Sequence, residues 1–155
     1  MSMDSINNSL KPEHTRCDTS FTELKDNARA GNWRQTKECF VALQQSLEEH
    51  LSMEEELLFP AFEKITGNRS GPTGIMRMEH GVIRNLLIRM AYALAQRDVD
   101  DFIYHAHNLL NKLQGHNLKE EKIMHLMADC ILLSKHVDLI DTSNTQTTPN
   151  SVITT

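Results

Sequence analysis

Apolar residues recur at steps of three and four along most of this chain, a pattern typical of helices that bury one face. The longest such series includes two polar positions. It runs Phe40, Leu43, Leu47, His50, Glu54, Leu57 and Ala61. Because a carboxylate inside a core is unfavourable unless it is paired, the pattern indicates that His50 and Glu54 face a charged partner within the protein.

The same periodicity predicts four helices joined by short connections. We expect them over residues 12–30, 33–65, 74–96 and 99–133. Short connections between helices favour antiparallel neighbours, so the predicted fold class is all-α, an up-down-up-down four-helix bundle over residues 12–133. Residues 1–11 are predicted to be a flexible lead-in, and residues 134–155 a mostly disordered tail because Thr, Ser and Asn dominate its end.

Two residues add detail to these helices. Pro60 lacks a backbone N–H and is predicted to kink the last turns of the second helix. Asp98 precedes the fourth helix and is predicted to be its N-cap.

An internal repeat relates the two halves of the chain at an offset of 66 residues. It pairs His14 with His80, His50 with His116, Glu54 with Glu120, and Glu13 with Glu79. In each half the first histidine and the HxxxE pair lie at similar distances from the connection between their helices. We therefore expect four imidazoles and two carboxylates to meet in one layer of the bundle interior.

Nitrogen and oxygen ligands without a thiolate suit iron, and suit manganese or zinc less well. Two carboxylates from different helices can bridge two metal ions, each of which would take two of the histidines. That arrangement leaves coordination open for a small molecule such as O2, NO or peroxide. The Glu-x-x-His pairs of ferritin-like di-iron sites are absent, because no histidine here has an acidic residue three positions before it.

Composition excludes several other classes of protein. The formal net charge is −5 without a basic cluster, which disfavours nucleic-acid binding. No segment is apolar enough to span a membrane, and Met1 to Leu10 does not resemble a signal peptide. The three cysteines are scattered and lack zinc-site spacing. These features predict a cytoplasmic location.

The chain resembles the hemerythrin-like HHE cation-binding domain over residues 12–133. The resemblance rests on Glu13-His14, the run HLSMEEELLFP that begins at His50, Glu79-His80, and the run HNLKEE that begins at His116. It implies a hemerythrin-like bundle with two non-haem iron ions, oxo- or hydroxo-bridged. The implied ligands are His14, His50, Glu54, His80, His116 and Glu120, with both glutamates bridging.

Two departures separate this chain from oxygen-carrying hemerythrins. Arg84 occupies the position of their second helix-3 histidine, and Glu120 follows His116 by four residues where they have an aspartate at five, the position of Glu121. The sequence leaves open whether Glu121 rather than Glu120 bridges. The symmetric ligand set is more similar to proteins that repair iron–sulfur clusters under oxidative or nitrosative stress, which implies an iron donor with a protein client.

Three alternatives remain at this point. The chain could be an O2 sensor or carrier, a metal-free helical module that binds another protein, or a zinc hydrolase with a histidine-rich site.

Overall fold

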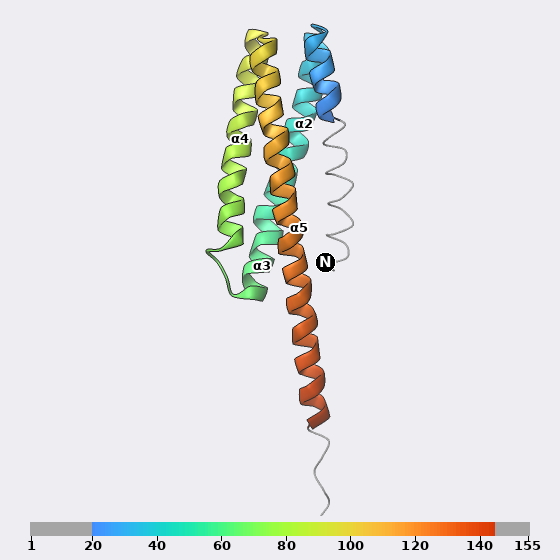
Figure 1. The fold of residues 1–155 in the computed structure, drawn as a ribbon, viewed down its shortest axis with the longest axis vertical. Coiled ribbons are helices and arrows are strands. Elements are labelled where there is room, and N and C mark those ends of the chain that lie inside the picture. Colours follow the sequence, from blue (N-terminus) through green and yellow to red (C-terminus); the bar gives the residue numbers. More distant parts are fainter. Residues whose placement is uncertain (1–19, 145–155) are drawn as a thin grey trace, which may run out of the picture.

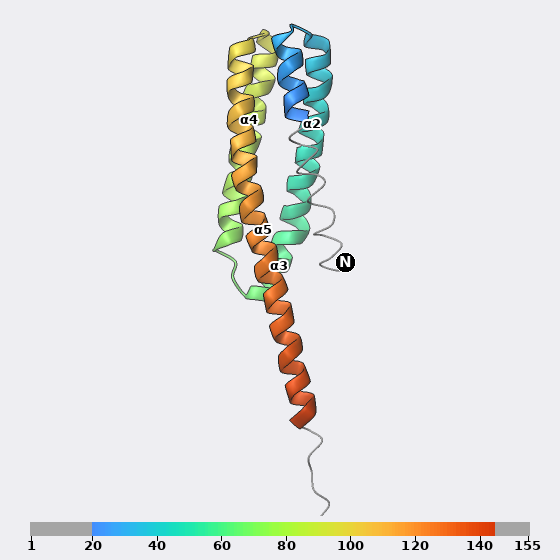
Figure 2. The same cartoon turned by 45° about the vertical axis from the view of Figure 1, so that its right-hand side comes forward.

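The computed structural model describes residues 20–144, and the side chains of residues 20–138. Within this part of the chain the fold is an all-α four-helix bundle, as predicted. The elements are a helical segment at residues 20–29, α2 (Trp33–Met53), η1 (Glu54–Leu58), α3 (Phe59–Thr66), α4 (Pro72–Gln96) and α5 (Val99–Asn144). The chain direction alternates from one helix to the next, with residues 20–29 beside α2 and α4 beside α5 (Figures 1 and 2).

Most of the predicted helix ends agree with the structure. The connection at residues 30–32 and the loop at residues 67–71 lie where breaks were predicted. The Asp98 cap is confirmed, because the backbone N–H of Asp101 donates a hydrogen bond to Asp98 Oδ1 at 3.0 Å. The predicted start of the first helix at Pro12 lies outside the described residues.

The second predicted helix contains one wide turn that its sequence pattern did not reveal. In η1 the backbone N–H of Phe59 bonds to the carbonyl of Glu54, five residues earlier, so this is a π turn. It ends two residues before Pro60, whose ring nitrogen has no hydrogen to donate to the preceding turn.

The π turn shifts the buried face by one residue. The prediction that Leu57 continues the buried series is therefore wrong: Leu57 is 51% exposed, and Leu58 and Phe62 are buried instead. Ala61 is partly buried and packs against the same apolar cluster as Leu58 and Phe62. A π turn adds one residue to the helical repeat, so every side chain after it rotates relative to those before it. As a result Phe59 and Phe62 face the core while Glu54 keeps its place in the earlier series.

The end of α5 also differs from the prediction. The helix was expected to end near Leu133 and the disordered tail to begin at Ser134, but α5 continues to Asn144. The sequence from Ser134 to Asn144 contains no Gly or Pro to stop a helix, and Pro149 is the first such residue. This part of α5 extends past the ends of α3 and α4 (Figures 1 and 2). Residues 145–155 lie outside the described part of the chain.

The apolar core forms two clusters with a polar layer between them. One cluster includes Leu51, Ile83 and Leu113, and the other includes Leu58, Met76 and Ile123. The predicted metal-binding positions lie on three stretches of helix: α2 continued by η1 and α3, α4, and α5. On each stretch they fall between a residue of the first cluster and a residue of the second. The bundle thus supplies an apolar wall above and below this layer.

Among residues 20–144, none of the helices is long and apolar enough to cross a membrane.

Candidate metal centre

Five of the six predicted ligands lie in the described part of the chain, and the fold brings all five together. His50 comes from α2, Glu54 from η1, His80 from α4, and His116 and Glu120 from α5. Glu54, His80 and Glu120 are fully buried, and His116 is 1% exposed. The His50 side chain keeps 11% of its surface exposed. The sixth, His14, lies outside the described residues.

One group of three side chains centres on Glu54 Oε2. The Nε2 atoms of His80 and His116 lie 2.7 and 3.1 Å from this oxygen. The same two Nε2 atoms are 3.2 Å apart. Three ligand atoms that converge so closely inside a core can hold a metal ion.

A second group shares Glu54 through its other oxygen. His50 Nε2 lies 2.7 Å from Glu54 Oε1 and 3.7 Å from Glu120 Oε2. Glu54 Oε1 has no partner of acceptable hydrogen-bond geometry among the described residues, although the His50 ring is so close. His50, Glu54 and Glu120 form the second set of atoms that could hold a metal ion. Glu54 thus offers one oxygen to each of two adjacent sites.

The structure places Glu120 and Glu121 differently. Glu120 is fully buried and belongs to the second group, whereas Glu121 lies on the exposed side of α5.

Two further carboxylates contact the outer nitrogens of the histidines. Glu55 Oε1 lies 2.6 Å from His80 Nδ1, and Glu79 Oε2 lies 3.2 Å from His116 Nδ1. A carboxylate in this position accepts the Nδ1 hydrogen and leaves the Nε2 lone pair free for a metal. Histidines that bind metals in proteins commonly have such a partner.

Sequence reasoning missed the role of these two carboxylates. The sequence did not single out Glu55, and it indicated Glu79 only as the repeat partner of Glu13 and as part of the Glu79-His80 pair in the family resemblance. The available signal was the repeat itself, since the 66-residue offset also pairs Glu55 with Glu121. The repeat could not predict the contact between Glu55 and His80, because these residues lie 25 positions apart on different helical elements.

The outer carboxylates, those of Glu55 and Glu79, form ion pairs with cationic side chains. Arg84 Nη1 lies 2.8 Å from Glu55 Oε1, and its Nη2 lies 2.8 Å from Glu48 Oε1. Lys112 Nζ is 3.2 Å from Glu79 Oε1, and Lys119 contacts the same oxygen. The hydrogen bond from Arg84 is the main reason that the pKa of Glu55 is lowered.

The buried groups also shift one another's pKa values. Burial by itself would lower the pKa of His50, but the carboxylates of Glu120 and Glu54 raise it to about 11. Burial would raise the pKa of Glu54, yet the surrounding imidazoles, led by His116, hold it well below its usual range. The metal-free cluster therefore attracts positive charge, which protons supply at neutral pH and which metal ions can supply in their place.

The remaining described histidines do not join either group. His105 is buried, but its Nε2 lies 3.3 Å from Asp101 in a separate pair on α5. His107 and His125 are exposed.

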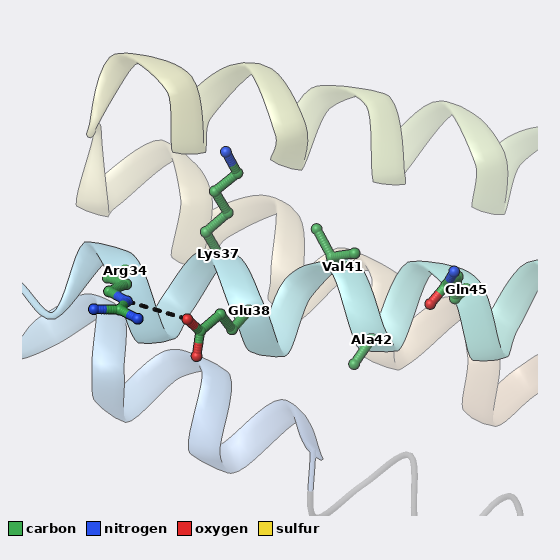
Figure 3. Close-up of a pocket in the computed structure, with 6 residues that line it drawn as sticks. All are labelled: Arg34, Lys37, Glu38, Val41, Ala42 and Gln45. Carbon is green, nitrogen blue, oxygen red and sulfur yellow. Dashed lines mark hydrogen bonds and ion pairs between the residues drawn. The ribbon is translucent and has the colours of Figure 1, made fainter.

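A shallow surface pocket on α2 lies apart from these groups (Figure 3). It has a volume of about 480 Å³. All six residues that line it are exposed: Arg34, Lys37, Glu38, Val41, Ala42 and Gln45. Arg34 Nε donates to Glu38 Oε1 at 3.2 Å across it. None of the candidate metal ligands contributes to this pocket.

Comparison with known proteins gives one match. The family model of the hemerythrin HHE cation binding domain matches residues 5–128. No curated protein and no solved structure matches the chain.

Proposed function

Since the chain belongs to the hemerythrin HHE cation-binding family, we propose that it is a non-haem di-iron protein that binds or reduces a small molecule, O2, NO or peroxide. The observation that carries this proposal is the sharing of buried Glu54 between two adjacent groups of ligand atoms. A single-metal site would need only one of these groups. Two groups with a common carboxylate are the arrangement expected for a pair of metal ions.

The chemistry of the donors favours iron. All of the donor atoms in the two groups are imidazole nitrogens or carboxylate oxygens. Neither Cys39 nor Cys130 belongs to them, so the thiolates typical of structural zinc sites are missing from the described cluster. Two buried carboxylates also supply negative charge that offsets the charge of the metal ions.

We assign the first iron to His80, His116 and Glu54, and the second to His50, Glu54 and Glu120. His14 is proposed as the remaining ligand of the second iron, because the 66-residue repeat makes it the counterpart of His80. The set would then have four histidines and two glutamates, with Glu54 common to both groups and Glu120 in the second group alone; the family resemblance implies that Glu120 bridges as well.

Iron held in this way supplies redox chemistry and open coordination to a small molecule. The protein's residues hold and orient the ligands, while the two apolar clusters limit the access of water to them. His50 is the least buried of the five described ligands, with 11% of its side chain exposed. A role as iron donor for cluster repair under stress would use the same centre with a protein client.

Optical titration tests this function. Metal-free protein is loaded with Fe(II) without oxygen and then mixed separately with O2, NO and hydrogen peroxide. We expect the spectrum of the loaded protein to change with at least one of them, and the same change in the His107→Ala variant, which lacks only an exposed imidazole outside both groups. A loaded protein whose spectrum responds to none of the three would overturn the proposal.

A further inference from the structure

Arg84 lies one helical turn after His80 on α4, close to the centre but outside both groups of candidate ligands. Its side chain instead contacts Glu48 of α2 and Glu55 of η1. Nη1 contacts Glu55 Oε1 at 2.8 Å, while Nε and Nη2 contact the two oxygens of Glu48 at 3.0 and 2.8 Å. A guanidinium can make these contacts together because its donors are arranged in a rigid fork.

The contact with Glu55 has a direct consequence for His80. Glu55 Oε1 accepts from Arg84 Nη1 and also lies 2.6 Å from His80 Nδ1. The Glu55 side chain is 30% exposed, whereas the His80 side chain is fully buried. A partly exposed carboxylate has several rotamers available, so its position beside His80 depends on what holds it there.

We propose that Arg84 is a positioning residue for the metal centre. It holds Glu55 as the acceptor of the His80 Nδ1 hydrogen, which orients the ring so that Nε2 faces Glu54 and His116 and its lone pair is available to a metal ion bound with them. This inference rests on the proposed function, because it assigns Arg84 a part in the binding of one iron. It predicts that Arg84 acts on the metal bound by His80 and acts through Glu55.

The other histidine of this group has an equivalent arrangement with different residues. Glu79 lies beside His116 Nδ1 and contacts Lys112 and Lys119. Each outer carboxylate is thus held by cations from outside the ligand groups. Glu79 is 6% exposed and has two cationic partners, but Arg84 is the one cation within 4 Å of Glu55 among the described residues. We therefore expect the centre to be more sensitive to the loss of Arg84 than to the loss of either lysine.

Fe(II) titration by calorimetry without oxygen tests the inference. The proteins are the wild type, Arg84→Gln, Arg84→Lys, Glu55→Gln and the double variant Arg84→Gln/Glu55→Gln, all as full-length chains. Arg89→Gln is the matched control, since Arg89 lies on the exposed side of α4 and its side chain bonds to Asn85 Oδ1. The thermal midpoint of each metal-free protein is measured alongside.

We expect Arg84→Gln to weaken one of two Fe(II) binding steps by about 10- to 100-fold and to leave the other step nearly unchanged. Arg84→Lys should lose less, because it keeps the charge but not the fork. The double variant should bind no more weakly than Glu55→Gln alone, since both substitutions remove the same support for His80.

Two results would overturn the inference while leaving the proposed function intact. One is an Arg84→Gln protein that binds both Fe(II) ions as tightly as Arg89→Gln does. The other is a double variant whose loss of Fe(II) affinity equals the sum of the losses of the two single variants, with thermal midpoints of the metal-free proteins that fall in the same order. Arg84 would then act only by stabilising the contact between the helices. A wild-type chain that binds no Fe(II) would overturn the proposed function and this inference with it.

Discussion

At the scale of residues, the centre depends on how one buried carboxylate is satisfied. Glu54 is fully buried and lies within hydrogen-bonding distance of imidazole nitrogens from His50, His80 and His116. A buried charged cluster of this kind adds little to stability by itself, because the desolvation of its members opposes their attraction. Metal binding, as proposed, would compensate the negative charge of the cluster and account for its place in the core.

A residue-scale prediction concerns Glu63, which lies at the end of the bundle beyond the centre. Glu63 Oε1 accepts from Thr73 Oγ1 at 2.8 Å and contacts Arg77 Nη1 at 2.5 Å. The hydrogen bond from Arg77, followed by that from Thr73, holds the pKa of Glu63 below its usual value of 4.5. A lowered folded-state pKa gives stability that is present above pH 4.5 and is lost as the pH falls through the folded value.

Glu63→Gln should therefore lower the free energy of unfolding of the metal-free protein by up to about 1 kcal/mol at pH 7. The difference from the wild type should shrink as the pH falls below 4.5. Urea unfolding at pH 7 and at a series of acidic values measures this. A difference that stays constant over the whole series would show that the charge of Glu63 does not stabilise the loop between α3 and α4.

At the scale of elements, the π turn sets which side chains face the core after Glu54. The ligand positions His50 and Glu54 precede or begin this turn, and the buried residues Leu58, Phe59 and Phe62 end or follow it. If the same residues formed a regular α turn, Leu58, Phe59 and Phe62 would rotate away from the α5 members of the second apolar cluster. The turn thus allows the continuous stretch α2–η1–α3 to place both candidate ligands and the apolar residues of the second cluster on the buried side.

Deletion of Glu56, an exposed residue within η1, tests this role. Because the deletion removes the extra residue, it should convert the π turn to an α turn and leave Leu58, Phe59 and Phe62 facing the core. The urea midpoint of the metal-free protein should therefore stay close to that of the control substitution Glu56→Ala. Deletion of Gln45, an exposed residue of α2 before the turn, should instead rotate Leu47 and Leu51 out of the core, with about 1.5–3 kcal/mol of burial lost for each. Equal midpoints for the two deletions would contradict the role of the turn.

At the scale of the whole molecule, the sequence was sufficient for the architecture and for bringing five of the six predicted ligands together. Regular three-and-four spacing predicts the helices, and the 66-residue repeat pairs His80 with His14, His116 with His50, and Glu120 with Glu54. The π turn was not predictable, because local spacing before it continued through Leu57 without interruption. The predicted end of α5 near Leu133 is wrong, because the polar residues that follow are compatible with a helix when no Gly or Pro interrupts it between Ser134 and Asn144.

Contacts between helices were the other part that sequence could not supply. The pair Arg84 and Glu48 is separated by 36 positions, and nothing in the spacing of charges on either helix singles it out. For the same reason the carboxylates beside His80 and His116 came only from the structure. His14 rests on the repeat and stays a prediction.

The central claim is that two iron ions share Glu54, and it is tested most directly by the iron content of protein purified without oxygen. Elemental analysis of the wild type and of Glu54→Ala measures the ions per chain. We predict about two iron ions per wild-type chain and loss of both in Glu54→Ala, because each group of ligand atoms loses a member. A wild-type chain with one zinc ion or no metal, or a Glu54→Ala chain that keeps its full iron content, would contradict the claim.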